Sequence, residues 1–99
     1  GGPATGLPTK TEQSDLLIAL HPAHGDARFP VIAPGTVEEC FYAMVNAINW
    51  AERYQGPVML LSEQVLAERT QNIPRPDLEK LVLESRKVYS EEGDYQRYE

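Results

Sequence analysis

The longest periodic pattern of apolar positions predicts a helix that begins after Thr36 and ends near Gln55. Its apolar residues recur every three or four positions, on one face of a 3.6-residue period. They are Val37, Phe41, Met44, Val45, Ile48 and Ala51. The stretch Thr36-Val37-Glu38-Glu39 has the form of a capping box, in which a hydroxyl and a carboxylate satisfy free amides at the helix start. Gly56 falls where a left-handed residue closes a helix, and Pro57 prevents its continuation.

Two short, continuous apolar runs flank this helix, at residues 29–33 and 58–61. Strands without polar alternation are typical of a sheet that is covered on both faces. A strand, a helix and a second strand within about 30 residues form the parallel crossover unit. The pattern therefore predicts an α/β fold. Two strands cannot protect both faces and both edges of a sheet, so we expect this chain to be part of a larger domain.

The polar segments predict loops and short helices around this unit. Residues 1–13 are rich in glycine, proline and threonine and predict an irregular loop. Ser14 is the expected N-cap of a short helix over residues 15–21, with Asp15 placed favourably against the helix dipole. Pro22 ends that helix.

The second half of the chain predicts two more short elements. We expect a helix to start at residues 62–64 and to run to Ala67, and Asp77 to cap one helical turn. From residue 84 onward the chain is charged, contains several tyrosines and offers little to bury. We therefore expect an α/β unit over residues 1–83 and a charged linker over residues 84–99.

Charge and cysteine content exclude several kinds of function. The 99 residues carry a net charge of −6, which disfavours binding to a phosphate backbone, so nucleic acid is not an expected partner. No apolar run approaches the roughly 20 residues that a bilayer crossing needs, and no secretory pattern is present, so we expect no membrane contact and a cytoplasmic location. Cys40, the single cysteine, cannot by itself hold an iron–sulfur cluster.

The residues that suggest chemistry lie in the first loop. Lys10, flanked by Thr9 and Thr11, offers a cation and two hydroxyls that could hold a carboxylate. The alternative is a solvated lysine among threonines that only form turns and caps. His21 and His24 are three residues apart, but no cysteine is near them, so we predict no metal site.

Three motifs in order make the chain resemble the alpha subunit of 2-oxoacid:ferredoxin oxidoreductases, most closely the 2-oxoglutarate type. They are the loop Gly-Leu-Pro-Thr-Lys-Thr-Glu-Gln, the helix start Ala-Pro-Gly-Thr-Val-Glu-Glu-Cys and the strand Pro-Val-Met-Leu-Leu-Ser. The resemblance runs from residue 2 to about residue 83. It implies that residues 1–83 are the C-terminal part of a pyrimidine-binding domain, a three-layer parallel-sheet fold of the thiamine diphosphate enzymes, incomplete in this chain.

The resemblance also implies an activity. Such enzymes decarboxylate a 2-oxoacid on thiamine diphosphate, pass electrons to ferredoxin and release an acyl-CoA. The beta subunit is the expected partner and supplies the diphosphate and Mg²⁺ site and an iron–sulfur cluster. Lys10, Thr9 and Thr11 are the implied substrate-binding residues, and His24, in a His-Gly-Asp turn, is a further candidate.

Two features of the family's alpha subunit are missing from this sequence. They are a Tyr-Pro-Ile-Thr-Pro-like substrate loop and the glutamate expected to touch the aminopyrimidine, so we predict no catalytic residue here and no activity of these residues alone, and the sequence does not identify the cofactor-binding residues. The alternative function is a non-catalytic α/β interaction domain, because a fold by itself does not specify an activity.

Overall fold

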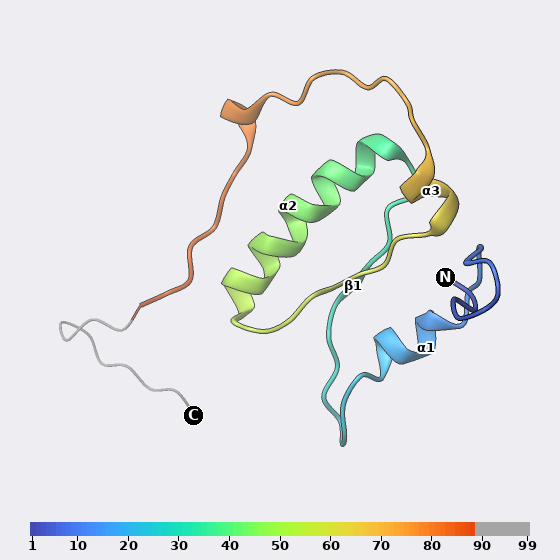
Figure 1. Cartoon of the computed structure of the whole chain (residues 1–99). Coiled ribbons are helices and arrows are strands. Elements are labelled where there is room, and N and C mark those ends of the chain that lie inside the picture. Colours follow the sequence, from blue (N-terminus) through green and yellow to red (C-terminus); the bar gives the residue numbers. More distant parts are fainter. Residues whose placement is uncertain (89–99) are drawn as a thin grey trace.

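The computed structural model describes residues 1–88 of the chain (Figure 1). Its elements, in order, are α1 (Asp15–Leu20), β1 (Val31–Ile32), α2 (Val37–Tyr54), β2 (Met59–Leu60), α3 (Gln64–Glu68) and the 3₁₀ turn η1 (Leu78–Lys80). Each predicted element is present close to its predicted place. Among these residues no helix is both long and apolar enough to cross a membrane.

The two strands pair in parallel, as the sequence predicts. Val31 lies opposite Met59, and the Leu61 amide donates to the Ile32 carbonyl at 2.9 Å. Only two residues of each predicted run have strand geometry. The α/β class is therefore confirmed, with shorter strands than the apolar runs suggest.

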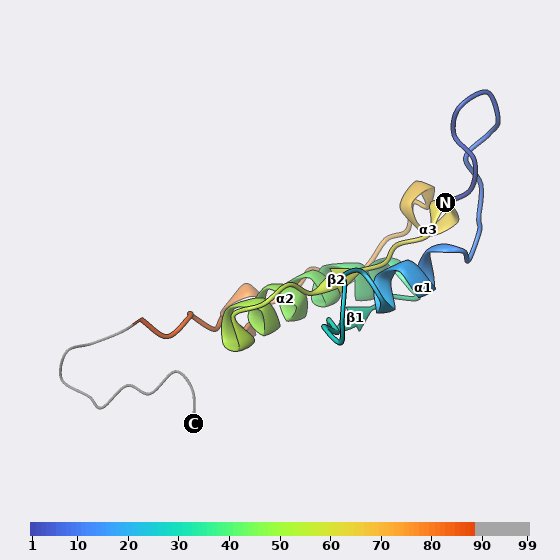
Figure 2. The same ribbon diagram turned by 90° about the horizontal axis from the view of Figure 1, so that it is seen from below.

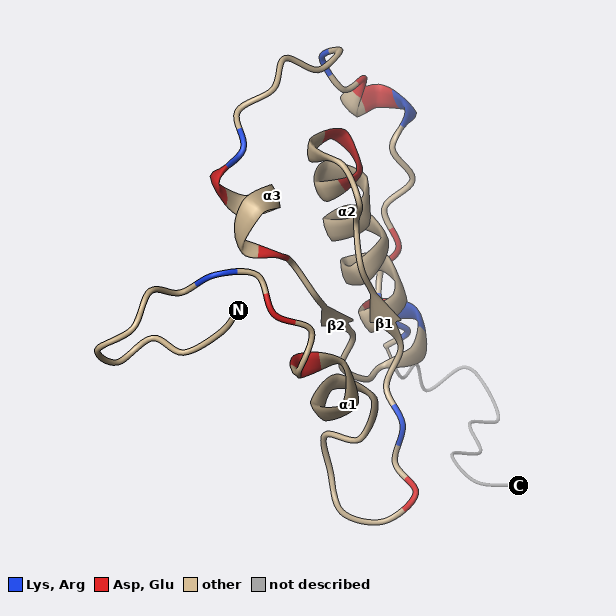
Figure 3. Ribbon diagram, turned by 90° about the vertical axis from the view of Figure 1, so that its right-hand side faces the viewer, with Lys and Arg blue, Asp and Glu red and all other residues tan. Residues whose placement is uncertain are grey.

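Helices lie on both faces of this small sheet. Figure 1 shows the strands between α2 on one side and α1 on the other, and Figure 3 shows α1 in front of the strands. The arrangement is a partial three-layer α/β/α unit. Most large apolar side chains of α1 are exposed: Leu17 is 69% exposed and Ile18 66%, while Ala19 is buried. Folding of these residues alone therefore leaves much apolar surface uncovered.

The start of α2 has the predicted cap, with one change. The Thr36 hydroxyl accepts a hydrogen bond from the Glu39 amide at 3.1 Å. The Glu39 carboxylate turns back and accepts from the Gly35 amide at 2.8 Å, one residue before the usual capping-box partner. Both ends of the box are thus used, and this confirms the predicted helix start.

At two helix ends the position is as predicted but the capping is different. The left-handed residue after α2 is Gln55, with φ of 52°, because the helix stops at Tyr54 and the turn comes one residue before Gly56. Ser14 precedes α1 with helical backbone angles, and its side chain makes no capping bond. A hydroxyl caps a helix only from an extended backbone, so Ser14 cannot act as predicted here.

The face of α2 that meets the sheet also differs from the predicted stripe. The helix packs against β2, and its buried residues are Ala43 and Ala47. In the predicted stripe, Met44 is 49% exposed and Ile48 is 53% exposed. Periodicity counts hydrophobic residues without regard to their size, whereas close approach of a helix to a strand selects small side chains.

After η1 the chain turns back along α2, on the side away from the strands (Figure 1). We call residues 82–88 the return segment. The side chain of Asn49 binds the main chain of this segment. Its Nδ2 donates to the Val82 carbonyl at 2.6 Å, and its Oδ1 accepts from the Glu84 main-chain amide at 3.0 Å. The predicted linker therefore begins as a docked segment, and the remainder, 89–99, lies outside the described residues.

An ion pair holds the return segment one helical turn further along α2. The Glu52 carboxylate accepts from the Arg86 Nε at 3.0 Å and from Nη2 at 3.1 Å, a two-point pairing of planar groups. It also accepts from the Arg86 main-chain amide at 3.1 Å. These bonds lower the pKa of Glu52, and the bond from the Arg86 side chain has the largest effect.

Asn49→Ala should release the return segment from α2, because it removes a donor and an acceptor at once. Loss of two exposed or half-buried hydrogen bonds corresponds to about 1–2 kcal/mol of local opening free energy. Hydrogen exchange of the amides at 82–86 in the intact protein should be about tenfold faster. Asn46→Ala, an exposed asparagine one turn earlier, is the control, and equal exchange in both variants would contradict this role.

The Glu52 ion pair should stabilise the docked return segment in a pH-dependent way. The pKa of Glu52 in the folded protein lies below its ordinary value of 4.5. The stabilisation is therefore fully present above that value and is lost as pH falls through the lowered pKa. Exchange protection of the return segment should be greater in wild type than in Glu52→Gln at neutral pH and equal in strong acid. A difference that persists in acid would exclude this ion pair as its source.

Candidate functional site at the carboxyl ends of the strands

The carboxyl ends of β1 and β2 lie at the same edge of the sheet because the strands are parallel. In open α/β sheets this is the edge where ligands bind. A cavity of about 230 Å³ lies there. Its walls come from the segments that follow the strands, from the end of the first loop and from the start of α1: Glu12, Gln13, Asp15, Leu16, Ala33, Pro34, Leu61, Ser62 and Glu63.

Residues 1–13, which we call the N-terminal loop, double back on themselves beside this cavity. The Gly2 amide donates to the Lys10 carbonyl at 2.8 Å, which closes the loop. A Cβ atom on Gly1 would lie 2.9 Å from the Thr9 methyl carbon, so the two arms touch. Gly6, with φ of +77°, provides the left-handed turn between them. Figure 2 shows the loop projecting from the body of the fold.

Glu63 fixes the base of the N-terminal loop. The Thr11 hydroxyl donates to one carboxylate oxygen of Glu63, across 52 positions of sequence. The other oxygen accepts from the Val65 amide at 3.0 Å and caps α3. Both hydrogen bonds lower the pKa of Glu63, and the bond from the Thr11 hydroxyl has the larger effect. The glutamate therefore links the loop to the end of β2.

The structure brings three of the four predicted site residues together. Thr9, Lys10 and Thr11 are consecutive, lie at the closure of the N-terminal loop and are all exposed. Lys10 does not line the 230 Å³ cavity, although Glu12, two residues further along the chain, does. Thr11 uses its one proton on Glu63, which leaves it only lone pairs to offer a ligand.

His24 is separate from these residues. It lies in the loop between α1 and β1, which leads into the amino end of the strand, and its side chain is exposed. Figure 1 places this loop at the opposite end of the sheet from the N-terminal loop, with α1 between them. Within residues 1–88, His24 therefore does not share a site with Lys10.

The cavity itself is acidic. Glu12, Asp15 and Glu63 contribute to its wall, and Figure 3 shows acidic segments where the loop joins α1 and where β2 leads into α3. Lys10 is the only lysine or arginine before Arg28. An anion at this edge would thus be attracted to the lysine side of the N-terminal loop and repelled by the cavity wall.

The described residues do not fit a metal-bound diphosphate. Within residues 1–88 no group of three His, Cys, Asp or Glu side chains is arranged to hold a metal ion. The acidic wall beside Lys10 would also repel a diphosphate. We therefore assign no cofactor contact to the described residues.

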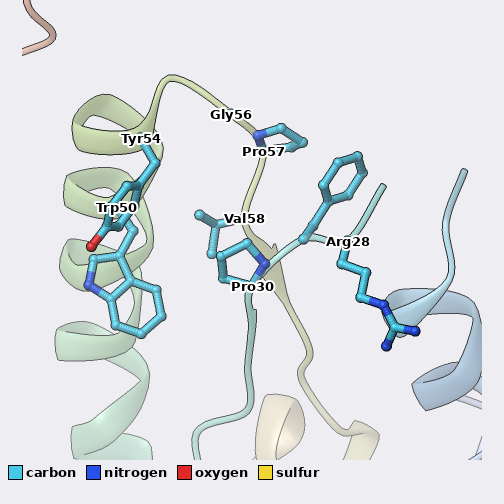
Figure 4. Close-up of a pocket in the computed structure, with 8 residues that line it drawn as sticks. Arg28, Pro30, Trp50, Tyr54, Gly56, Pro57 and Val58 are labelled. Carbon is cyan, nitrogen blue, oxygen red and sulfur yellow. The ribbon is translucent and has the colours of Figure 1, made fainter. Parts of the chain in front are cut away.

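A second cavity, of about 250 Å³, lies at the amino ends of the strands and was not predicted. Figure 4 shows Trp50 and Tyr54 on α2 at one side of it, Pro30 and Val58 in the middle and Arg28 on the far side. Trp50 is 41% exposed. Tyr54 is 66% exposed, so its packing among these residues is incomplete.

The sequence family described as pyruvate flavodoxin/ferredoxin oxidoreductase, thiamine diphosphate-binding, matches residues 1–98. The chain belongs to this family. The resemblance found in its motifs is thereby confirmed, and with it the origin of the α/β unit in a thiamine-diphosphate-binding domain.

Individual members of this oxidoreductase family are similar over most of the chain. The alpha subunit of 2-oxoacid:ferredoxin oxidoreductase 2 from Aeropyrum pernix is 40% identical over 101 positions, covering 99% of this chain and 16% of that subunit. The 2-oxoglutarate oxidoreductase subunit KorA of Mycobacterium tuberculosis is 43% identical over 81 positions, covering 82% of this chain and 12% of that subunit.

A solved structure has the same fold. It is 2-oxoglutarate:ferredoxin oxidoreductase from Magnetococcus marinus with 2-oxoglutarate, coenzyme A and succinyl-CoA bound. It superposes with a TM-score of 0.86 and 48% identity, covering 100% of this chain and 17% of that one. The chain thus spans less than a fifth of the length of each of these three relatives.

Proposed function

We propose that this chain is part of the alpha subunit of a thiamine diphosphate-dependent 2-oxoacid:ferredoxin oxidoreductase, with 2-oxoglutarate as its substrate. The enzyme oxidatively decarboxylates the 2-oxoacid to an acyl-CoA. The observation that carries the proposal is similarity over the whole chain to a structure that binds 2-oxoglutarate and coenzyme A. A cytoplasmic location belongs to the same proposal.

The role we propose for this part of the enzyme is to hold the substrate carboxylate. Lys10 supplies a cation at the ligand-binding edge of the sheet, and the closed N-terminal loop fixes its main chain. An ammonium held in place before the substrate arrives costs less ordering on binding than a free lysine. Thr9 lies next to it and retains a hydroxyl for the same carboxylate.

The remaining chemistry belongs to other parts of the enzyme. When bound, thiamine diphosphate stabilises the carbanion that decarboxylation leaves behind. We propose that the cofactor and its Mg²⁺ are held with the beta subunit, which also carries the iron–sulfur cluster that passes electrons to ferredoxin. Cys40, the single cysteine here, agrees with that division.

Reconstitution of the full alpha subunit with its beta subunit tests the function directly. The complex, supplied with thiamine diphosphate, Mg²⁺ and CoA, should reduce ferredoxin or viologen when 2-oxoglutarate is added, and should prefer it to pyruvate and to branched-chain 2-oxoacids. Failure with every 2-oxoacid would reject the enzyme and favour the non-catalytic interaction domain.

Lys10→Ala in that complex should raise the KM for 2-oxoglutarate by about 10- to 100-fold, the effect of losing one charge-assisted hydrogen bond to a carboxylate. The KM for CoA should change little. Lys10→Arg should retain most of the affinity, because the charge remains. Lys80→Ala removes an exposed lysine on η1 and is the matched control. An unchanged KM for the 2-oxoacid in Lys10→Ala would remove Lys10 from the site.

A further inference from the structure

We infer that Glu63 is a positioning residue for the substrate-binding lysine, acting through Thr11. Glu63 does not itself bind the substrate; it holds the N-terminal loop so that Lys10 projects from a fixed place. The inference rests on the proposed function of Lys10. It assigns a role to a carboxylate that the sequence indicates only as part of a helix start.

Glu63 is well placed to act as a support. It follows the last residue of β2 by three positions and caps α3, so its main chain is held by the sheet on one side and by a helix on the other. Each carboxylate oxygen has a different partner, Thr11 and the Val65 amide, and this fixes the orientation of the group. Its side chain is half-buried, unlike Lys10 itself.

The hydrogen bond from Thr11 to Glu63 also constrains Lys10, because Thr11 and Lys10 are adjacent in the chain. The main chain of Lys10 is then held on both sides: its own carbonyl accepts from Gly2 at 2.8 Å, and the next residue is tied to Glu63. Thr9 lies close to Gly1 on the other arm of the loop. Lys10 and Thr11 are therefore held, one through its main chain and the other through its side chain, while the Lys10 side chain stays exposed for a ligand.

The arrangement also limits the electrostatic cost of a carboxylate near an anion-binding lysine. Each Glu63 carboxylate oxygen already accepts one hydrogen bond, so its lone pairs are partly used before a substrate arrives. The same bonds lower the pKa of Glu63 and keep it ionised as an acceptor. An unbonded acid at this place would instead compete with the substrate for Lys10.

Glu63→Asp separates the bond to Thr11 from the cap of α3. Aspartate is a good N-cap and should keep the bond to the Val65 amide, but it is one methylene too short to reach Thr11. Thr11→Val removes the hydroxyl at nearly constant shape, and Thr11→Ser restores it. Glu68→Asp, in the same short helix, is the matched control, since the Glu68 carboxylate accepts only from Gln64 among the described residues.

In the full alpha–beta complex, Glu63→Asp and Thr11→Val should each raise the KM for 2-oxoglutarate about three- to tenfold, the effect of one hydrogen bond. The double variant should be no worse than either single one, because both remove the same bond. Thr11→Ser should restore the wild-type KM, and kcat and the KM for CoA should change little. Unchanged KM values, or effects that add, would overturn the inference.

Hydrogen exchange of residues 1–13 in the same complex gives a readout that needs no activity. Both substitutions should speed exchange of the loop equally, and Glu68→Asp should not. If wild-type enzyme turns over no 2-oxoacid, the proposed function fails, whatever the loop does. If turnover is normal but the loop exchanges as in wild type after Glu63→Asp, the positioning role of Glu63 is wrong.

Discussion

Parallel pairing of β1 with β2 is the constraint on which the rest of this structure depends. Parallel strands must be joined by a crossover, so α2 has to cross one face of the sheet between them. The same pairing brings both carboxyl ends to one edge, where the chain departs into α2 from one strand and into α3 from the other. The N-terminal loop meets the sheet at that edge through Glu63. Without the strand pairing, Thr11 and Glu63 would not be brought close enough to form their hydrogen bond.

The order and type of the elements could be predicted because each has a local cause. Thr36 and Glu39 cap α2 within one turn, and Asp77 caps η1 through the Glu79 amide. Apolar runs without alternation predicted parallel strands, and the structure has them. Such signals lie within a few residues of what they determine, so a single sequence contains them.

Two errors are local, in the capping at Ser14 and at Gln55, and the others concern contacts between distant segments. Ala43 and Ala47 are buried because they allow α2 to approach β2, and that depends on the space between layers and not on hydrophobicity alone. The bond from Thr11 to Glu63 joins residues 52 positions apart, and no periodicity reports it. The one available signal was general: an acidic residue just after a parallel strand lies at the ligand-binding edge. The predicted substrate roles of Lys10, Thr9, Thr11 and His24 remain predictions, and His24 lies at the other end of the sheet.

The return segment is recognised through its peptide groups more than through its side chains. Asn49 and Glu52 bind the Val82 carbonyl and the Glu84 and Arg86 amides, and side-chain ion pairs are added at two positions, Arg86 with Glu52 and Glu84 with Arg53. Most identities along residues 82–88 can therefore change while the alignment on α2 is kept. Proline is the exception at 84 and 86, because an imino acid has no hydrogen to give at either place. Helix α2 thus fixes the spacing of the main-chain groups that it binds, and it places few requirements on the side chains of the return segment.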